Sequence, residues 1–319
     1  MERRDLIHIG EGFLMGGADI IPGVSGGTMA LILGVYERLV GAISHFDLTL
    51  LRLLRERKWL KDAQHVDLLF LVLLGCGVLS GILLLASSMH WLLENQLQHT
   101  YAAFFGMILA SSYLVWRLIG RGGLDVVLLA LVGAAGAYWL VGLKALENPT
   151  ISPLYIFLCG IISICAMILP GISGSFILVL LGAYFEITGI LGKLVQGEIT
   201  EKTWLLLYFG AGAAIGLLGF SKILRWLLTR FEAATMALLF GFMLGSLRKI
   251  WPYKVVVVDN EKFELRIFEN VLPDLSSSNA WISLGILIVA AGLVVLLEWL
   301  AQHRQGNAGQ TPEKQSSLS

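Results

Sequence analysis

Two apolar segments of this chain are each interrupted by a Pro-Gly pair, and these interruptions constrain the fold more than any other feature. The first reads Ile21-Pro-Gly-Val-Ser-Gly-Gly-Thr28 and the second reads Leu169-Pro-Gly-Ile-Ser-Gly-Ser-Phe176. In a bilayer, the backbone groups that a broken helix frees must be satisfied by protein or by a water-filled cavity. Matched interruptions in two halves of a membrane protein are typical of a transporter's substrate site.

The composition places the chain in a membrane. Of its 319 residues, 56% are hydrophobic and 14% are charged, whereas soluble domains carry about 25% charged residues. The formal net charge is zero, so no overall positive field favours nucleic acid as a partner. The three cysteines lie in apolar segments without metal-ligand spacing, which favours a packing role. We therefore expect an integral membrane protein that binds no nucleic acid.

Hydrophobic stretches predict an all-α polytopic fold. A membrane-spanning helix needs about 17–25 apolar residues, and six stretches meet this length: 66–90, 98–119, 124–142, 203–222, 234–251 and 280–300. Two further apolar segments, 9–44 and 153–192, contain the Pro-Gly breaks. Each is either a pair of crossing helices or a re-entrant hairpin of two shorter helices. Their short, interrupted character favours the hairpin.

Aligning the chain with itself indicates an internal duplication. At an offset of 148, residues 21–36 match residues 169–184 at seven of sixteen positions. At an offset of 135, residues 91–112 match residues 226–247 at nine of twenty-two. Two matched blocks in the same order make chance similarity between Gly-rich segments a poor explanation.

The duplication predicts two repeats, 1–148 and 149–301, each a broken hairpin followed by three helices. Because three is an odd number, the second copy is expected to be inverted relative to the first, as in alternating-access transporters. Arginine and lysine in the loop 45–65 and at the N-terminus favour a cytoplasmic location for both ends of the first broken segment. Three crossings in each half then return the C-terminus to the cytoplasm. Residues 302–319 are expected to form a disordered cytoplasmic tail. The long loop 252–279 is placed outside, with a small β-hairpin from Lys254–Asp259 and Lys262–Phe268.

The breaks are candidate anion sites. After each Pro-Gly pair the chain restarts a helix, whose first N–H groups are unpaired and lie at the positive end of the helix dipole. Such N-termini bind phosphate and other anions, and the two restarts are expected to meet near mid-membrane. The alternative is that the glycines only permit close helix packing. The predicted substrate-binding residues are Pro22, Gly23, Ser25, Gly26, Gly27, Thr28, Pro170, Gly171, Ser173, Gly174 and Ser175.

Charged residues inside apolar segments are costly and are candidates for coupling transport to an ion. Asp19 precedes the first break, and its counterpart Met167 is apolar. Asp19 is expected either to take up a coupling ion or to cap the broken helix. Glu37, Arg38 and Glu186 are further coupling candidates. Arg38 and Glu186 are expected either to pair across the repeat interface or to face lipid headgroups.

Other basic residues lie near predicted helix ends, where they either extend toward lipid phosphates or form a basic vestibule: Arg117, Arg121, Lys222 and Arg225. The sequence contains no GxxxxGK[ST] loop, no HExxH motif and no paired carboxylates of a hydrolase. We therefore expect a transporter and not an enzyme, without a metal or cofactor other than a coupling proton or sodium ion.

The stretch Gly17-Ala-Asp-Ile-Ile-Pro-Gly-Val-Ser-Gly-Gly-Thr28, with Pro170-Gly-Ile-Ser-Gly174 in the second half, resembles the PopT family of prokaryotic membrane proteins. The resemblance covers roughly residues 5–300. It implies translocation of undecaprenyl phosphate, the lipid carrier of envelope glycans, from the outer to the inner leaflet of the bacterial cytoplasmic membrane. It implies a binding role for the residues of both breaks.

Three functional hypotheses follow. The first is a lipid-phosphate translocase that works by alternating access, with the phosphate held at the two breaks and the tail in lipid. The second is a secondary transporter of a small soluble anion. The third, an enzyme acting on lipid phosphates, lacks a visible nucleophile or metal cluster.

Overall fold

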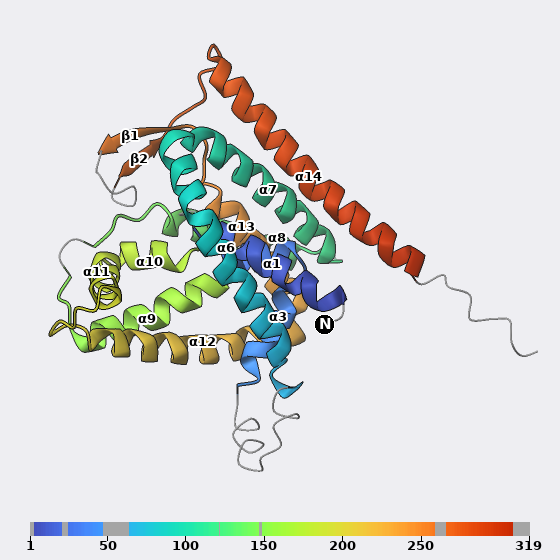
Figure 1. Cartoon of the computed structure of the whole chain (residues 1–319). Coiled ribbons are helices and arrows are strands. Elements are labelled where there is room, and N and C mark those ends of the chain that lie inside the picture. Colours follow the sequence, from blue (N-terminus) through green and yellow to red (C-terminus); the bar gives the residue numbers. More distant parts are fainter. Residues whose placement is uncertain are drawn as a thin grey trace, which may run out of the picture.

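The computed structural model describes residues 3–20, 25–46, 64–120, 122–146, 149–258 and 266–308. Within these ranges the protein is almost entirely helical, with one small two-stranded sheet at its edge (Figure 1). The predicted all-α polytopic membrane fold is confirmed.

Four helices contain stretches long and apolar enough to cross a membrane: α6 (Leu68–Asn95), α7 (Leu97–Leu118), α12 (Leu205–Arg230) and α14 (Ser278–Ala308). Helices α8 (Leu124–Leu140) and α13 (Glu232–Ser246) occupy the other two predicted spans but are shorter. Each of the six predicted stretches thus forms a helix.

The two broken segments each contain three helices, so the expectation of two shorter helices was wrong. The first holds α1 (Arg3–Asp19), α2 (Gly26–Ile32) and α3 (Tyr36–Ser44), and the second holds α9 (Pro153–Ile168), α10 (Gly174–Leu180) and α11 (Tyr184–Val195). The chain bends by 119° between α2 and α3 and by 115° between α10 and α11. Glycines with positive φ make these bends, Gly34 at +73° and Gly182 at +63°, a conformation that other residues adopt at a cost. Each bent pair, α2 with α3 and α10 with α11, is a broken span or a re-entrant loop.

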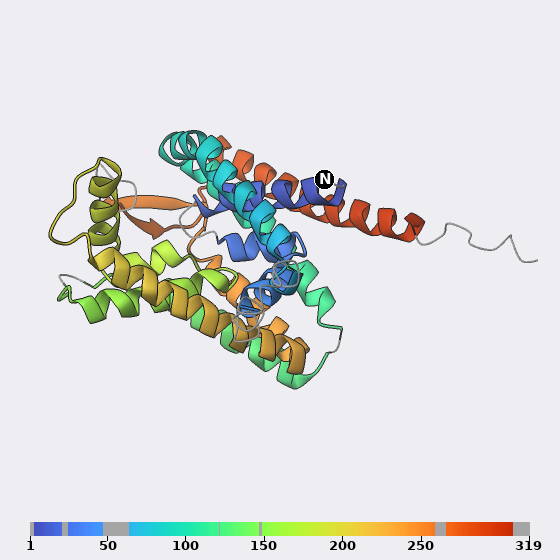
Figure 2. The ribbon, with the colours of Figure 1, turned by 60° about the horizontal axis from the view of Figure 1, so that its bottom comes forward.

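The helices pack in four close pairs: α1 along α6, α9 along α12, α7 along α14 and α8 along α13 (Figures 1 and 2). Glycines permit this approach. A Cβ atom on Gly77 of α6 would overlap the Ile9 carbonyl oxygen of α1, and one on Gly212 of α12 would overlap that of Phe157 in α9. Small residues at such contacts are typical of membrane helices.

Two of the pairs join the halves of the chain. A Cβ atom on Gly106 of α7 would overlap the Leu287 carbonyl oxygen of α14, and one on its counterpart Gly241 of α13 would overlap that of Ala130 in α8. Each matched glycine therefore packs against the last helix of the other half. The inversion of the two halves in the membrane stays a prediction.

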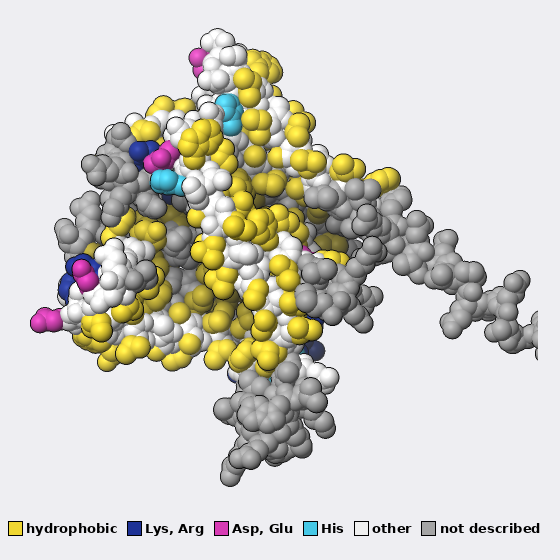
Figure 3. All heavy atoms as spheres, viewed as in Figure 1, with side chains coloured by type: hydrophobic (Ala, Val, Ile, Leu, Met, Phe, Trp, Pro, Cys, Tyr) yellow, Lys and Arg dark blue, Asp and Glu magenta, His cyan; other side chains and the backbone are white. Residues whose placement is uncertain are grey.

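The outward faces of the helices are apolar, as lipid contact requires. Leu83 of α6 is 79% exposed and Leu207 of α12 is 74% exposed. Figure 3 shows hydrophobic side chains covering much of the visible face, with few charged ones among them. In water, so large an apolar surface would aggregate.

The expected β-hairpin is present and follows α13. Strand β1 (Lys254–Val258) pairs antiparallel with β2 (Ile267–Asn270). The second strand lies further along the chain than predicted, and residues 259–265 lie outside the described ranges. Helix α14 continues to Ala308, so residues 302–308, expected to be disordered, are helical; no proline interrupts the chain before Pro312. Residues 309–319 lie outside the described ranges.

Candidate functional site

At the first break the protein itself occupies the N-terminus of the restarted helix. The Gly26 N–H donates to a carboxylate oxygen of Asp19 at 2.5 Å. The Gly27 N–H donates to the Ser25 hydroxyl oxygen at 3.1 Å, which is the usual N-cap arrangement. Asp19 thus caps the broken helix, one of its two predicted roles. A carboxylate therefore lies where an anion is expected to bind.

The second break is built differently. Gly171 adopts a φ of +88°, and helix α10 begins after Ser173, whose side chain makes no hydrogen bond to the helix N-terminus. Instead, the Ser173 and Ser175 hydroxyls share a hydrogen bond of 2.7 Å. Ser173 is buried and Ser175 is exposed. No acidic side chain caps this helix among the described residues.

The two breaks lie against each other. The Gly171 N–H donates to the Thr28 hydroxyl oxygen at 2.7 Å, and the Ser25 hydroxyl donates to the Met167 carbonyl at 3.2 Å. The Tyr36 hydroxyl, at the start of α3, donates to the Ile168 carbonyl at 3.1 Å. The backbone groups freed at the second break are thus partly satisfied by hydroxyls from the first.

Two glycines of the site allow close packing. A Cβ atom on Gly27 would lie 2.8 Å from the Ile168 carbonyl oxygen, and one on Gly171 would lie 2.7 Å from the Ser246 hydroxyl oxygen of α13. Close packing, the alternative role of these glycines, is therefore present here: Gly27 lets the first break approach the second, and Gly171 lets the second break approach α13.

Two of the remaining predicted site residues, Pro170 and Gly174, lie beside this contact. Gly174 is buried, and a Cβ atom on it would lie 2.9 Å from the Ser163 carbonyl oxygen of α9. Pro170 is buried beside Gly171. Pro22 and Gly23 lie outside the described residues. The role of all these residues in substrate binding stays a prediction.

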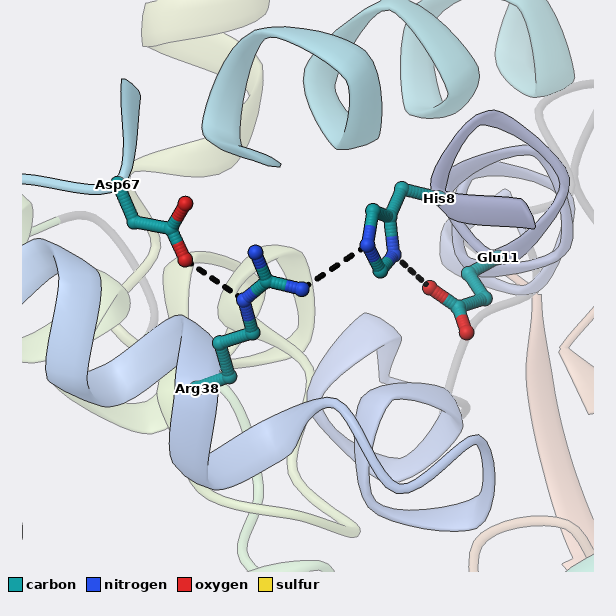
Figure 4. Close-up of polar contacts among 4 residues, drawn as sticks. All are labelled: His8, Glu11, Arg38 and Asp67. Carbon is teal, nitrogen blue, oxygen red and sulfur yellow. Dashed lines mark hydrogen bonds and ion pairs between the residues drawn. The ribbon is translucent and has the colours of Figure 1, made fainter. Parts of the chain in front are cut away.

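Two of the other coupling candidates, Arg38 and Glu186, have charged partners of their own. Arg38 donates to the Asp67 carboxylate at 2.6 Å and contacts the His8 ring at 2.9 Å, and His8 in turn contacts Glu11 at 2.7 Å (Figure 4).

Glu186 pairs with Lys202 at 2.7 Å. Arg38 therefore pairs within the first half and Glu186 within the second, and they do not pair with each other. The sequence offsets relate Arg38 to Glu186 and Asp67 to Lys202, so the halves carry corresponding pairs with the charges exchanged. Glu37 is exposed.

A cation near the second break was not singled out from the sequence. The Lys249 ammonium lies 4.3 Å from the centroid of the Phe176 ring in α10, a favourable cation–π distance. Among the described residues no carboxylate pairs with Lys249. The sequence could have indicated Lys249 as a functional residue, because it falls within the predicted span 234–251 and a charged side chain inside a membrane span is costly.

A second lysine adjoins it. Lys254 of β1 donates from its ammonium to the Lys249 carbonyl at 2.8 Å and lies 5.3 Å from the Tyr101 ring centroid. Burial and the nearby charge of Lys249 lower the pKa of Lys254 to about 7. The region beside the second break thus carries positive charge without a carboxylate partner in the described part of the chain.

Comparisons with known proteins agree with this membrane fold. A family model described as undecaprenyl phosphate translocase-like (VCA0040-like) matches residues 15–264, which include both breaks. A Vibrio cholerae protein named polyprenyl-phosphate transporter is 38% identical over 304 residues, covering 92% of this chain and 96% of that protein. A Staphylococcus aureus protein of the same name is 29% identical over 263 residues, covering 79% and 88%. No solved structure matches the chain.

Proposed function

The chain belongs to the undecaprenyl phosphate translocase-like family, and from this premise we propose that it transports polyprenyl phosphate across the bacterial cytoplasmic membrane. Its two named relatives are polyprenyl-phosphate transporters that align over most of its length. The apolar helices supply the membrane setting that such a substrate requires. We place the N-terminus in the cytoplasm because of the basic residues near it and in the loop 45–65. We place the C-terminus there as well, because the three helices after each hairpin make an even number of crossings in total.

The proposed direction is from the outer to the inner leaflet, which returns the carrier for another round of envelope glycan synthesis. The proposed substrate is undecaprenyl phosphate, in keeping with the family description. The phosphate enters the protein while the isoprenoid tail remains in lipid.

The phosphate site is proposed at the two breaks, and the observation that carries this is the position of the Asp19 carboxylate. It accepts a hydrogen bond from Gly26 at the N-terminus of α2, so one anion already occupies the site. A substrate phosphate that takes the same N–H must displace the carboxylate. The displaced side chain is stabilised by taking up a proton or a sodium ion, which would couple transport to that ion.

The second break supplies complementary groups. The Ser173 and Ser175 hydroxyls bond only to each other among the described side chains, so either is available as a donor to phosphate. Lys249, close to Phe176 in the same helix, adds positive charge. Hydroxyls with a lysine form a familiar phosphate-binding combination.

Alternation is proposed to come from movement of one repeat against the other about this contact. The hydrogen bond between Thr28 and Gly171 crosses from one half to the other, and rearrangement there would expose the phosphate to each leaflet in turn. The only ion proposed to take part in this cycle is the coupling proton or sodium ion.

Depletion of the protein in living bacteria tests the function. Undecaprenyl phosphate exposed on the outer surface is measured with an externally added lipid-phosphate binder. We expect depletion to raise the exposed carrier severalfold, and re-expression to restore the original amount. Unchanged surface carrier after depletion, in cells lacking other carriers of this activity, would overturn the proposal. Unchanged surface carrier with altered uptake of inorganic phosphate would favour a soluble-anion transporter instead.

A further inference from the structure

An open cationic cavity lies away from the breaks, between α3 and the C-terminal part of α12. Its volume is about 470 Å³, and it is lined by Ser44, Lys222, Arg225, Trp226 and Thr229. Figure 1 shows α3 crossing beside this end of α12. Four of the five lining residues are spaced three, one and three positions apart along α12, so they lie on one face of this helix over about two turns.

Within the described ranges, neither cation of this cavity has a carboxylate partner. Arg225 donates one hydrogen bond from its guanidinium, to the Ser44 hydroxyl at 3.0 Å, and Lys222 makes none within the described residues. A guanidinium has five N–H donors, so most of those of Arg225 remain available. The Ser44 hydroxyl donates its proton to the Gly41 carbonyl at 2.7 Å, so the hydroxyl oxygen is left to accept from Arg225. This hydrogen bond fixes the Arg225 side chain.

Helix α3 connects this cavity to the breaks. Its first residue, Tyr36, bonds to the Ile168 carbonyl at the second break, and its last residue, Ser44, lines the cavity. At a rise of about 1.5 Å per residue, Tyr36 and Ser44 lie about 12 Å apart along the axis of α3. Ser44 also directly precedes the basic loop 45–65, which we place on the cytoplasmic side.

We propose that this cavity is a second binding site for a phosphate monoester, occupied by the substrate's phosphate on the cytoplasmic side of its passage. The inference rests on the proposed function for the identity of the lipid, and on the two cations, which no carboxylate pairs with among the described residues, for the chemistry. Lys222 supplies a point charge, Arg225 a planar set of donors matched to phosphate oxygens, and Trp226, which is 57% exposed, a surface for the first part of the tail.

The charge of the site favours a monoester over an ordinary phospholipid. A phosphate monoester carries a charge of about −1.5 to −2 near pH 7, which two cations can balance. A diester headgroup such as phosphatidylglycerol carries a single negative charge and offers fewer free oxygens. The cavity is therefore expected to prefer the substrate to the surrounding lipids.

Acylation of lysine measures occupancy of the cavity directly. The full-length protein in phosphatidylcholine nanodiscs is treated with an amine-acylating reagent, and modification of Lys222 is followed by mass spectrometry. Lys193, an exposed lysine of α11, is the internal control. The probes are farnesyl phosphate, farnesol, inorganic phosphate and phosphatidylglycerol added to the nanodisc.

We expect farnesyl phosphate to slow acylation of Lys222 at least fivefold and to leave Lys193 unchanged, with no effect of farnesol. Arg225→Gln should abolish this protection, whereas Arg230→Gln, a cation of the same helix outside the cavity, should preserve it. Both variants keep Lys222 as reporter, and their native thermal unfolding is checked first. Protection that survives Arg225→Gln would overturn the proposal.

The other probes identify the source of the phosphate. Equal protection by phosphatidylglycerol, or by inorganic phosphate at the same concentration, would overturn the assignment to an isoprenyl monoester. Transport of isoprenyl phosphate without protection of Lys222 would contradict this inference and leave the proposed function intact. Protection without transport in reconstituted vesicles would support the site and contradict the proposed function.

Discussion

The backbone N–H of Gly171 donates a 2.7 Å hydrogen bond to the hydroxyl oxygen of Thr28, which lies 143 positions earlier in the chain. This bond joins the two helix breaks and crosses between the two halves of the protein. Thr28 is fully buried, so the Gly171 N–H has no access to bulk water in its place. The breaks are therefore a single structural unit.

Thr28→Val tests the value of this bond. The substitution keeps the shape of the side chain but leaves a buried N–H without an acceptor, which costs about 1–3 kcal/mol. We expect a lower thermal midpoint in detergent and slower transport. Thr28→Ser, which keeps the hydroxyl, is the control and should retain both properties better than valine. A valine variant as stable and active as the wild type would show that the bond contributes nothing.

Asp19→Asn tests the competition between carboxylate and phosphate. The neutral amide still caps Gly26 but binds its N–H less strongly, because hydrogen bonds to charged groups contribute about 1.5–3 kcal/mol. We expect tighter binding of farnesyl phosphate, by about tenfold or more, and loss of the pH dependence of transport. Asp19→Glu is the charge-retaining comparison. Unchanged affinity together with an unchanged pH profile would exclude Asp19 as the coupling residue.

Sequence patterns predicted the helices, the two breaks and the β-hairpin, because hydropathy and Pro-Gly pairs act locally. They did not predict the second bend in each broken segment. Gly34 and Gly182 make those bends through positive φ values, and a lone glycine in an apolar run is equally compatible with helix packing.

The candidate site was predicted only in part, for a similar reason. The four residues Ser25–Thr28 follow a recognisable motif and lie at the contact between the breaks. Lys249 reaches the second break through the packing of α13 and the chain that follows it, and no local pattern records such a long-range contact. The pairing of Arg38 with Asp67 likewise depends on how α3 sits beside α6.

Two glycines of α6 give a matched test of helix packing. Gly77 meets the backbone of α1, whereas Gly75, two residues earlier, has open space around it. Gly77→Ala is expected to lower stability by about 1–3 kcal/mol through overpacking. Gly75→Ala should be neutral or raise stability by up to about 1 kcal/mol through helix propensity. Thermal midpoints in the same detergent compare them, and equal effects would contradict the α1–α6 packing.

The lowered pKa of Lys254 predicts how the stability of the protein depends on pH. Its pKa is about 7 in the folded protein, below the ordinary value of about 10.4 that it regains on unfolding. Between these values the unfolded state binds the extra proton, so stability should rise as the pH rises from 7 to 10. Lys254→Met should reduce this rise, whereas Lys193→Met, at an exposed position, should not. An identical pH profile for wild type and Lys254→Met would refute the assignment.

Transport in reconstituted vesicles tests the central claim, that the paired breaks hold the phosphate of a translocated polyprenyl phosphate. A fluorescent isoprenyl phosphate is incorporated into both leaflets, and a membrane-impermeant reductant bleaches only the outer pool. We predict that the wild-type protein exposes the inner pool to the reductant. Ser173→Ala with Ser175→Ala should slow this exposure by about tenfold, as the loss of hydrogen bonds to a charged group implies. Thr188→Val, on α11, should not slow it. Bleaching limited to the outer leaflet with the wild type, or an undiminished rate in the double-serine variant, would contradict the account.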